Sequence, residues 1–483
     1  MPDGLMNKAI TAGRSHLVAV TVLILLGALL RLPWLAEPPN VVFDEVHFGK
    51  YASGYCCSHE RFFDIHPPHA KLLIAGAAYA GGYRGGFSFN NIGQAYPEDV
   101  PVFYLRLIPA IAGILLPIAL FAVMRLVGAS LAAAFAAGFL ICLDNAIWVQ
   151  TRMIALDGVL WLSMLASIAC LLKAQRIGSM RGRIGWLILC GIFMGLAIGT
   201  KITGLTTGVV ALALMANELL ERRTGLNTLI FFRQGVWILA PCVLIYMAGW
   251  ALHFALLTEP GPGDSFYRPT GEFMQDVVMQ HSVMLGANVG LTAGHSDASP
   301  WWSWPFMAVP LFYWAQAERV IYFVGNPVVW WGSTAIVVTA LMVLLLQPLT
   351  RLRLPVLSDP GASSDQLPAG ETDLSGTSSG SLIFRVSGIG LVISFLPLAD
   401  VSRSLFLYHY VPTLFFALML AIAWLERCGW TEAGKSPFRQ PLRYWGVLLG
   451  AVIGFVLMLP LTGGLASFAW WRSLLFGLFP LWP

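Results

Sequence analysis

Residues 41–75 read VVFDEVHFGKYASGYCCSHERFFDIHPPHAKLLIA and carry an Asp-Glu pair, two adjacent cysteines and a His-Pro-Pro-His motif. The stretch directly follows the first long apolar run, Leu17–Ala36. So many polar groups stand out in a chain that is 57% hydrophobic and 11% charged, with a mean hydropathy of +0.72. An ordinary soluble domain has about 25% charged residues. The composition therefore places the chain in a lipid bilayer, with residues 41–75 as its most reactive loop.

Apolar runs long enough to cross about 30 Å of hydrocarbon recur along the chain. About eleven of them are predicted to be membrane-spanning helices: Leu17–Ala36, Val102–Val127, Ser130–Asp144, Asp157–Ala174, Ile184–Ile198, Ile202–Leu220, Val236–Leu257, Pro327–Leu346, Phe384–Ala399, Phe406–Leu425 and Tyr444–Thr462. The first run lacks a small-residue cleavage site, so we interpret it as a retained anchor instead of a signal peptide. The predicted fold class is an all-α polytopic membrane protein.

The distribution of charge predicts the orientation of these helices. If the N-terminus is cytoplasmic, a majority of the 29 basic residues lie in inner loops and a majority of the 25 acidic residues lie outside. The net charge of +4 is too small to indicate a nucleic-acid partner. Residues 37–101 and 258–326 are then extracytoplasmic loops, and the Gly/Ser/Asp-rich residues 354–381 are a flexible cytoplasmic linker. Residues 1–483 are predicted to form one membrane domain, whose Trp-rich tail lies in the membrane interface.

Asp44 precedes a helix-compatible run, Glu45–Tyr55, and two roles are open to it. An Asp in this position often caps the helix by accepting a hydrogen bond from a free backbone N–H. Glu45 would then be a carboxylate of the first turn, which the helix dipole favours. A rigidly held carboxylate is also a candidate general base. As neighbours on one helix the two carboxylates diverge by about 100°, so they are poorly placed to form the pair that a glycoside hydrolase needs.

Five basic side chains are predicted at the outer membrane surface, against the general charge trend: Arg31, Arg106, Arg152, Lys201 and Arg403. Any one of them could be an anchor whose charged end reaches water. Together, beside Asp44, they predict a site for the phosphate of a lipid-linked sugar. The lipid phosphate of such a donor leaves as a stabilised anion, so the reaction needs cations instead of a general acid. One carboxylate then suffices to activate an incoming hydroxyl group.

The segment His66-Pro67-Pro68-His69 is predicted to be extended and rigid, because consecutive prolines restrict the backbone. Its histidines, with His47, His59 and the adjacent cysteines, raise the alternative of a metal site. Their spacing matches no familiar zinc pattern, so no metal ligand is predicted, and a dependence on divalent metal is left open. Cys56 and Cys57 could oxidise if this loop faces an oxidising compartment.

Several segments resemble one family in the same order. They are FDEVHFGKYA (43–52), FFDIHPPHAKLL (62–73), TRMIALDGVL (151–160), GTKITGL (199–205), SWPF (303–306), VIYFVGNPVVWW (320–331) and SRSLFLYHYVPTLFFALML (402–420). This pattern is similar to the dolichyl/polyprenyl-phosphate-mannose protein O-mannosyltransferases, glycosyltransferase family 39. The resemblance covers nearly the whole chain.

The resemblance implies a GT-C membrane glycosyltransferase in the inner or plasma membrane, with its active site on the extracytoplasmic face. It would transfer mannose, with inversion, from polyprenyl-phosphate-mannose to Ser or Thr hydroxyl groups of exported proteins. The family's Asp-Glu falls on Asp44 and Glu45 as catalytic residues. Its phosphate-binding cations fall on Arg31, Arg106, Lys201 and Arg403. Candidates for positioning donor and acceptor are His47, His66, His69, Asp157, Tyr408 and His409.

The chain also departs from the family pattern. Residues 258–326 are too short for the MIR sugar-binding domain of fungal and animal members, which favours a bacterial-type member. The family more often has Leu-Gly where this chain has His69-Ala70, so contacts to the acceptor can differ. The implied partners are the lipid donor, membrane lipid, an exported acceptor protein and the protein-export machinery. An alternative acceptor is lipid A or another envelope glycan, whereas a secondary transporter would need its polar residues in mid-membrane.

Overall fold

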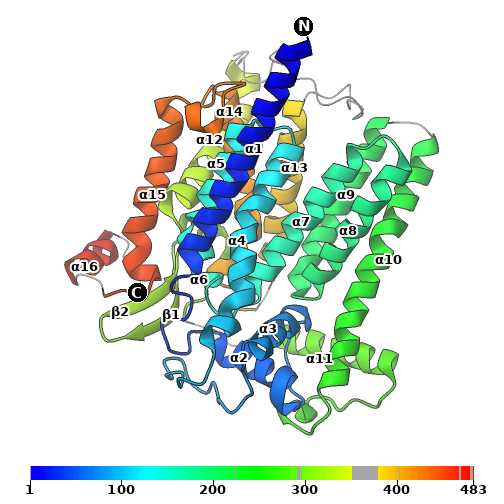
Figure 1. The fold of residues 1–483 in the computed structure, drawn as a ribbon, viewed down its shortest axis with the longest axis vertical. Helices are drawn as coiled ribbons and strands as arrows, with labels where there is room; N and C mark the ends of the chain where they lie inside the picture. The colour runs from blue at the N-terminus through cyan, green and yellow to red at the C-terminus, as the bar shows by residue number, and fades with distance from the viewer. Residues whose placement is uncertain are drawn as a thin grey trace.

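The computed structural model describes residues 2–222, 225–290, 294, 296–350, 379–401, 403–466, 469–478 and 482. Most of the predicted linker 354–381 lies outside the described residues, and its last positions begin helix α13 (Ser379–Phe395). Helices dominate the rest of the chain, and Figure 1 shows the long ones running side by side. The predicted all-α polytopic class is confirmed.

Among the described residues, ten helices are long and apolar enough to cross a membrane. They are α1 (Pro2–Arg31), α4 (Val102–Leu126), α7 (Asp157–Gln175), α8 (Met180–Ile198), α9 (Leu205–Arg222), α10 (Gly225–Leu256), α12 (Pro327–Thr350), α13, α14 (Val411–Arg427) and α15 (Leu442–Thr462). The ten-residue helix α16 (Ala469–Leu478) is too short to span and leaves Trp470 and Leu478 exposed.

The predicted eleventh span, Ser130–Asp144, differs in the structure. Its helix α5 (Leu131–Cys142) ends before Leu143, and a second short helix, α6 (Asn145–Gln150), begins after Asp144. The twelve residues of α5 reach about 18 Å, too little to cross the bilayer alone. The buried Asp144 carboxylate causes the break, because it accepts hydrogen bonds from the Ile147 backbone N–H at 3.0 Å and the Trp330 indole at 2.8 Å.

The centre of the bundle is formed by α7 and α14, which are mostly buried. Helix α7 packs against α4 and α8, and α14 packs against α12 and α13. The first residues of both helices therefore lie deep within the protein, at the end of the bundle opposite the N-terminus (Figure 1). This position brings the segments before α7 and α14 close to the loop that holds Asp44.

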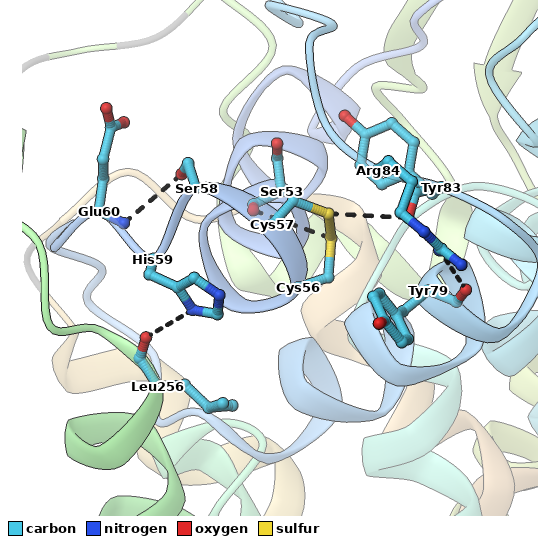
Figure 2. Close-up of a disulfide and its surroundings, with 10 residues drawn as sticks. All are labelled: Ser53, Cys56, Cys57, Ser58, His59, Glu60, Tyr79, Tyr83, Arg84 and Leu256. Carbon is cyan, nitrogen blue, oxygen red and sulfur yellow. Dashed lines mark hydrogen bonds between the residues drawn. A yellow bond between two sulfur atoms is a disulfide. The ribbon is translucent and has the colours of Figure 1, made fainter.

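Short helices from both predicted outer loops gather at that end of the bundle (Figure 1). They are α2 (Glu45–Ser53), the π-turn η1 (Gly54–Ser58) and α3 (His69–Ala80) from the first loop, and α11 (Phe273–Gly290) from the second. Arg61 joins the loops through a 2.6 Å ion pair with Asp264. Figure 2 shows His59, after η1, bonded through Nδ1 to the Leu256 carbonyl at 2.9 Å.

Two features of these loops could not be read from hydropathy. A two-stranded antiparallel hairpin, β1 (Leu311–Gln316) and β2 (Arg319–Phe323), interrupts the helical architecture in the second loop. In the first loop, Cys56 and Cys57 form a disulfide next to the Tyr83 carbonyl (Figure 2). The disulfide answers the question of their redox state left open by the sequence.

Candidate active site

Asp44 occupies the position before α2, but its side chain makes no capping hydrogen bond. The preceding residue, Phe43, has a positive φ of 44° and stacks on Tyr313 of β1, with ring centroids 4.1 Å apart. The Phe43 N–H also donates to the Tyr313 carbonyl at 3.2 Å. The hairpin thus fixes the backbone that presents Asp44, and the capping interpretation of its carboxylate is wrong.

Glu45 points the other way and is completely buried. Its carboxylate forms an ion pair with Arg106 at 2.8 Å and accepts a 3.0 Å hydrogen bond from the Tyr96 hydroxyl. The backbone N–H groups of Val42 and Ile154 each donate to it at 2.9 Å. This network ties three segments of the chain together. Neither Glu45 nor Arg106 lines the cavity that Asp44 enters.

Asp44 lines a cavity of about 550 Å³ between the first loop and the membrane helices. The cavity collects eight of the predicted site residues: Asp44, His47, His66, Asp157, Lys201, Arg403, Tyr408 and His409. Apolar side chains also line the cavity, including Leu160 and Trp161 of α7 and Leu398. The cavity therefore combines charged and polar groups with apolar side chains of membrane-spanning helices.

Lys201 is held in the cavity by a chain of hydrogen bonds. Its Nζ donates to Asp157 Oδ1 at 2.8 Å, and the second Asp157 oxygen accepts from Gln150 Nε2 at 2.7 Å. Tyr313 in turn donates to Gln150 Oε1. The Lys201 Nζ also lies 5.1 Å from the Tyr408 ring centroid. The hairpin that fixes Phe43 therefore also orients the lysine across the cavity.

Arg403 brings the second cation to the cavity. Its Nη1 donates to Asn288 Oδ1 of α11 at 3.1 Å, so Asn288, and not the nearby Asp400, is the partner that the structure gives it. Next to it, His409 Nδ1 lies 3.0 Å from the Phe406 carbonyl. Burial, followed by the positive charge of Lys201, lowers the pKa of His66 well below its usual range. His66 is therefore a neutral ring beside the two cations.

Burial raises the pKa of Asp44 to about 7, Lys201 opposes this rise, and the carboxylates of Asp157 and Asp64 add to it. The last two already form ion pairs, Asp157 with Lys201 and Asp64 with Lys71. Within the part of the chain that the structure describes, the Asp44 carboxylate makes no ion pair closer than 4.0 Å. Asp44 can therefore exchange a proton near neutral pH, which is the property of a general base.

The chain matches two consecutive models of one family. Residues 21–258 match the dolichyl-phosphate-mannose-protein mannosyltransferase model, and residues 273–478 match the C-terminal four TMM region of protein-O-mannosyltransferase. The chain belongs to the protein O-mannosyltransferase family. The sequence-based family assignment is confirmed.

Individual members of the family cover only part of this chain. Dolichyl-phosphate-mannose–protein mannosyltransferase 4 of Candida albicans is 38% identical over 275 residues, 54% of this chain and 36% of that protein. Protein O-mannosyl-transferase 1 of Danio rerio is 34% identical over 255 residues, 51% of this chain and 35% of that protein. The matched segment thus spans about a third of these curated relatives.

Solved structures show the same fold. The S. cerevisiae protein O-mannosyltransferase Pmt1-Pmt2 complex bound to the sugar donor superposes with a TM-score of 0.84 at 18% identity, over 97% of this chain and 92% of that one. The Archaeoglobus fulgidus oligosaccharyltransferase superposes with a TM-score of 0.52 at 14% identity, over 96% and 57% of the two chains. The predicted GT-C fold is confirmed.

Five predicted site residues of this O-mannosyltransferase-family chain lie away from the cavity: Arg31, Glu45, His69, Arg106 and Arg152. Arg31 is fully buried and donates to Thr151 Oγ1 at 2.9 Å. Arg152 donates to the Trp34 carbonyl at 2.7 Å and stacks on Trp148. With Arg106 bound to Glu45, the three arginines serve internal packing, and the expectation that all five cations surround one anion is not supported by their positions.

His69 links the end of α8 to α10 through hydrogen bonds. Its ring nitrogens lie 3.0 Å from the Gly199 carbonyl and 2.8 Å from the Ile245 carbonyl. A Cβ at Gly199 or Gly249 would come within 2.1 Å of the ring, so both positions need glycine. The two histidines of the His-Pro-Pro-His motif therefore differ in role. His66 lines the cavity, and His69 holds helices together.

Sequence reasoning missed three polar residues around the cavity: Asp64, Gln150 and Asn288. Asp64 could have been singled out, because it stands in the same polar stretch two residues before His66. Gln150 and Asn288 carried no such signal, since isolated amide side chains are common near helix ends. Their tasks depend on partners far away in the sequence, Asp157 and Tyr313 for Gln150 and Arg403 for Asn288.

Proposed function

We propose that this chain is a polyprenyl-phosphate-mannose–protein O-mannosyltransferase, which transfers mannose to Ser or Thr hydroxyl groups of exported proteins. One observation carries the proposal: Asp44, with its pKa near neutrality, shares a single cavity with the cations Lys201 and Arg403. The apolar side chains of its lining, which include Leu160 and Trp161, suit the isoprenoid part of the donor. The names of the family models agree with this donor and acceptor.

The proposed reaction is a single displacement with Asp44 as general base. The Asp44 carboxylate takes the proton of the acceptor hydroxyl, whose oxygen forms a bond to the anomeric carbon of mannose. The bond from that carbon to the phosphate oxygen breaks, and polyprenyl phosphate leaves as an anion. Lys201 and Arg403 stabilise the charge that develops on this phosphate, so no general acid is required. Attack from the face opposite the phosphate inverts the anomeric centre.

We further propose that residues 1–483 form one membrane domain in the cell membrane, with the cavity on its extracytoplasmic face. The disulfide between Cys56 and Cys57 supports this side, because disulfides persist in oxidising compartments. The bias of basic residues toward the opposite loops supports it as well. Membrane lipid and the export machinery would then be its surroundings during transfer.

The function is tested with the purified full chain in lipid nanodiscs. We expect dolichyl-phosphate-mannose and a Ser/Thr-rich peptide to yield an α-mannosylated peptide, the inverted product of a β-linked donor, detected by mass spectrometry and α-mannosidase digestion. A parallel reaction offers lipid A as the acceptor. Transfer to lipid A without transfer to the peptide would replace the proposed acceptor with an envelope glycan. Retention of the donor's anomeric configuration would contradict the single displacement.

The raised pKa of Asp44 predicts the pH dependence of transfer. A general base must be ionised, so kcat/KM should fall about tenfold for each pH unit below a pKa of about 7 and level off above it. The measurement is the initial rate of peptide mannosylation across this range, with the folded fraction checked at each pH. A flat profile through neutral pH would contradict the assignment of Asp44 as the titrating base.

Substituting Arg403→Lys tests how the donor phosphate is bound. Lysine keeps the charge but loses the planar two-pronged geometry of the guanidinium, so we expect the donor KM to rise about tenfold or more. Arg268→Lys is the matched control, because Arg268 is an outer-loop arginine that does not line the cavity and its side chain is 78% exposed. An unchanged donor KM in Arg403→Lys would mean that Arg403 is a surface anchor.

A further inference from the structure

The exposed face of α11 is mostly apolar, with Gln275 and Ser282 as its exposed polar residues, and it carries no charged side chain. Met274, Val278, Leu285 and Val289 are between 58% and 68% exposed, and they recur at helical spacing along one side. The one charged residue of the helix, Asp276, is buried and accepts hydrogen bonds from Tyr267 and Thr270. Exposed apolar side chains in this pattern, on a helix that exposes no charge, favour contact with lipid over contact with water.

The opposite face of α11 packs crosswise on the last turns of α10 (Figure 1). Val277 and Met284 form a small core with Trp250, and Tyr246 bonds to His281 at 2.5 Å. The 32 residues of α10 reach about 48 Å, well beyond the hydrocarbon thickness of about 30 Å. Tyr and Trp side chains concentrate where hydrocarbon meets the headgroups. The attachment point of α11 is therefore at this boundary.

Lipid also reaches the part of α10 to which α11 is attached. Leu244 and Leu252 of α10 are 69% and 48% exposed, at the level where α11 is attached. In a spanning helix such side chains face lipid. The bilayer that covers them would extend over Val278 and Leu285 of α11.

We propose that α11 lies in the outer headgroup–acyl boundary of the bilayer, its membrane seat, and that this location positions Arg403. The link is Asn288 in the last turn of α11. Its Oδ1 accepts from Arg403 Nη1 at 3.1 Å, and its Nδ2 donates to the Met284 carbonyl at 2.9 Å. The depth of α11 in the membrane then determines how far Arg403, the proposed phosphate-binding residue, lies from the hydrocarbon core. Asn288 is a positioning residue, and this part of the inference rests on the proposed function.

The membrane seat is tested independently of activity with a nitroxide label at Leu285→Cys in proteoliposomes of phosphatidylcholine and phosphatidylglycerol. A Cys428→Ser background removes the exposed free cysteine found among the described residues. We expect the label to collide more often with oxygen, which partitions into lipid, than with a water-soluble nickel chelate. The matched label at Arg268→Cys should show the reverse.

Two results would overturn the membrane seat. A label at position 285 that collides with the nickel chelate as often as the control does would place α11 in water. A label shielded from both reagents would mean that protein covers this face, such as a second copy of the chain or a bound acceptor. Neither result depends on whether the chain transfers mannose.

The link to the cavity is tested with Asn288→Ala. Losing its hydrogen bond to a charged group should raise the donor KM about tenfold and leave kcat within about threefold. Asn91→Ala, at an exposed position of the first loop, is the matched control. An unchanged donor KM would contradict the positioning role. A fall in kcat of about tenfold at constant KM would contradict it as well. Donor-dependent transfer by the unsubstituted chain is measured in parallel, so this failure is distinct from failure of the proposed function.

Discussion

Replacing Asp44 with Asn is expected to lower kcat by about 10²-fold or more, the range for losing a general base. The Asn side chain has nearly the same volume, and the Asp44 carboxylate makes no capping bond that the fold requires. The backbone at this position is held by Phe43 and Tyr313, which the substitution leaves intact. The protein should therefore fold, and its donor KM should change little. The measurement is steady-state mannosylation of a peptide in nanodiscs.

The control for this substitution is Asp99→Asn, which removes an exposed carboxylate from the same outer loop. It should leave kcat within about twofold of the unsubstituted chain, as is usual for a surface group away from the reacting atoms. Near-normal turnover of Asp44→Asn would remove Asp44 from the mechanism. Another carboxylate in the cavity, Asp64 or Asp157, would then have to be the base.

The second large effect concerns stability instead of turnover. Glu45→Ala is expected to lower the free energy of unfolding by about 3–5 kcal/mol, because it leaves the Arg106 charge buried without its partner. Both side chains of this ion pair are fully inaccessible to solvent. Two backbone N–H groups, of Val42 and Ile154, lose their acceptor as well. Thermal unfolding of the purified protein in one detergent measures the loss.

Comparison with Arg106→Met and with the double variant separates charge burial from side-chain loss. The single Arg106 substitution leaves the Glu45 carboxylate buried and uncompensated, so it should destabilise to a similar extent. The double variant should be more stable than the two losses added together, because neither charge remains alone. Glu98→Ala, an exposed carboxylate, is the matched control. A loss below about 1 kcal/mol for Glu45→Ala would contradict the structural role and return Glu45 to the list of catalytic candidates.

The membrane fold was accessible from the sequence, because long apolar runs have few alternatives to spanning helices. The break at Asp144 was not, since a buried carboxylate can end a helix when distant partners such as Trp330 satisfy it. Motif order was sufficient to name the family. Among the candidate site residues, Asp44, Lys201 and Arg403 line one cavity. A place near the outer end of a predicted span did not distinguish them from Arg31, Arg106 and Arg152, which do not line it.

The sequence by itself determined the bilayer environment, the helical class, the family and the segment that carries the proposed base, Asp44. These follow from hydropathy and from motifs that are local in the chain. The tertiary structure alone decided which charges face the cavity: Arg31, Arg106 and Arg152 resemble Lys201 and Arg403 in sequence, yet they bind to partners inside the protein. The physical reason is that the task of a buried cation is set by its partners, and here these lie 44 to 120 positions away along the chain.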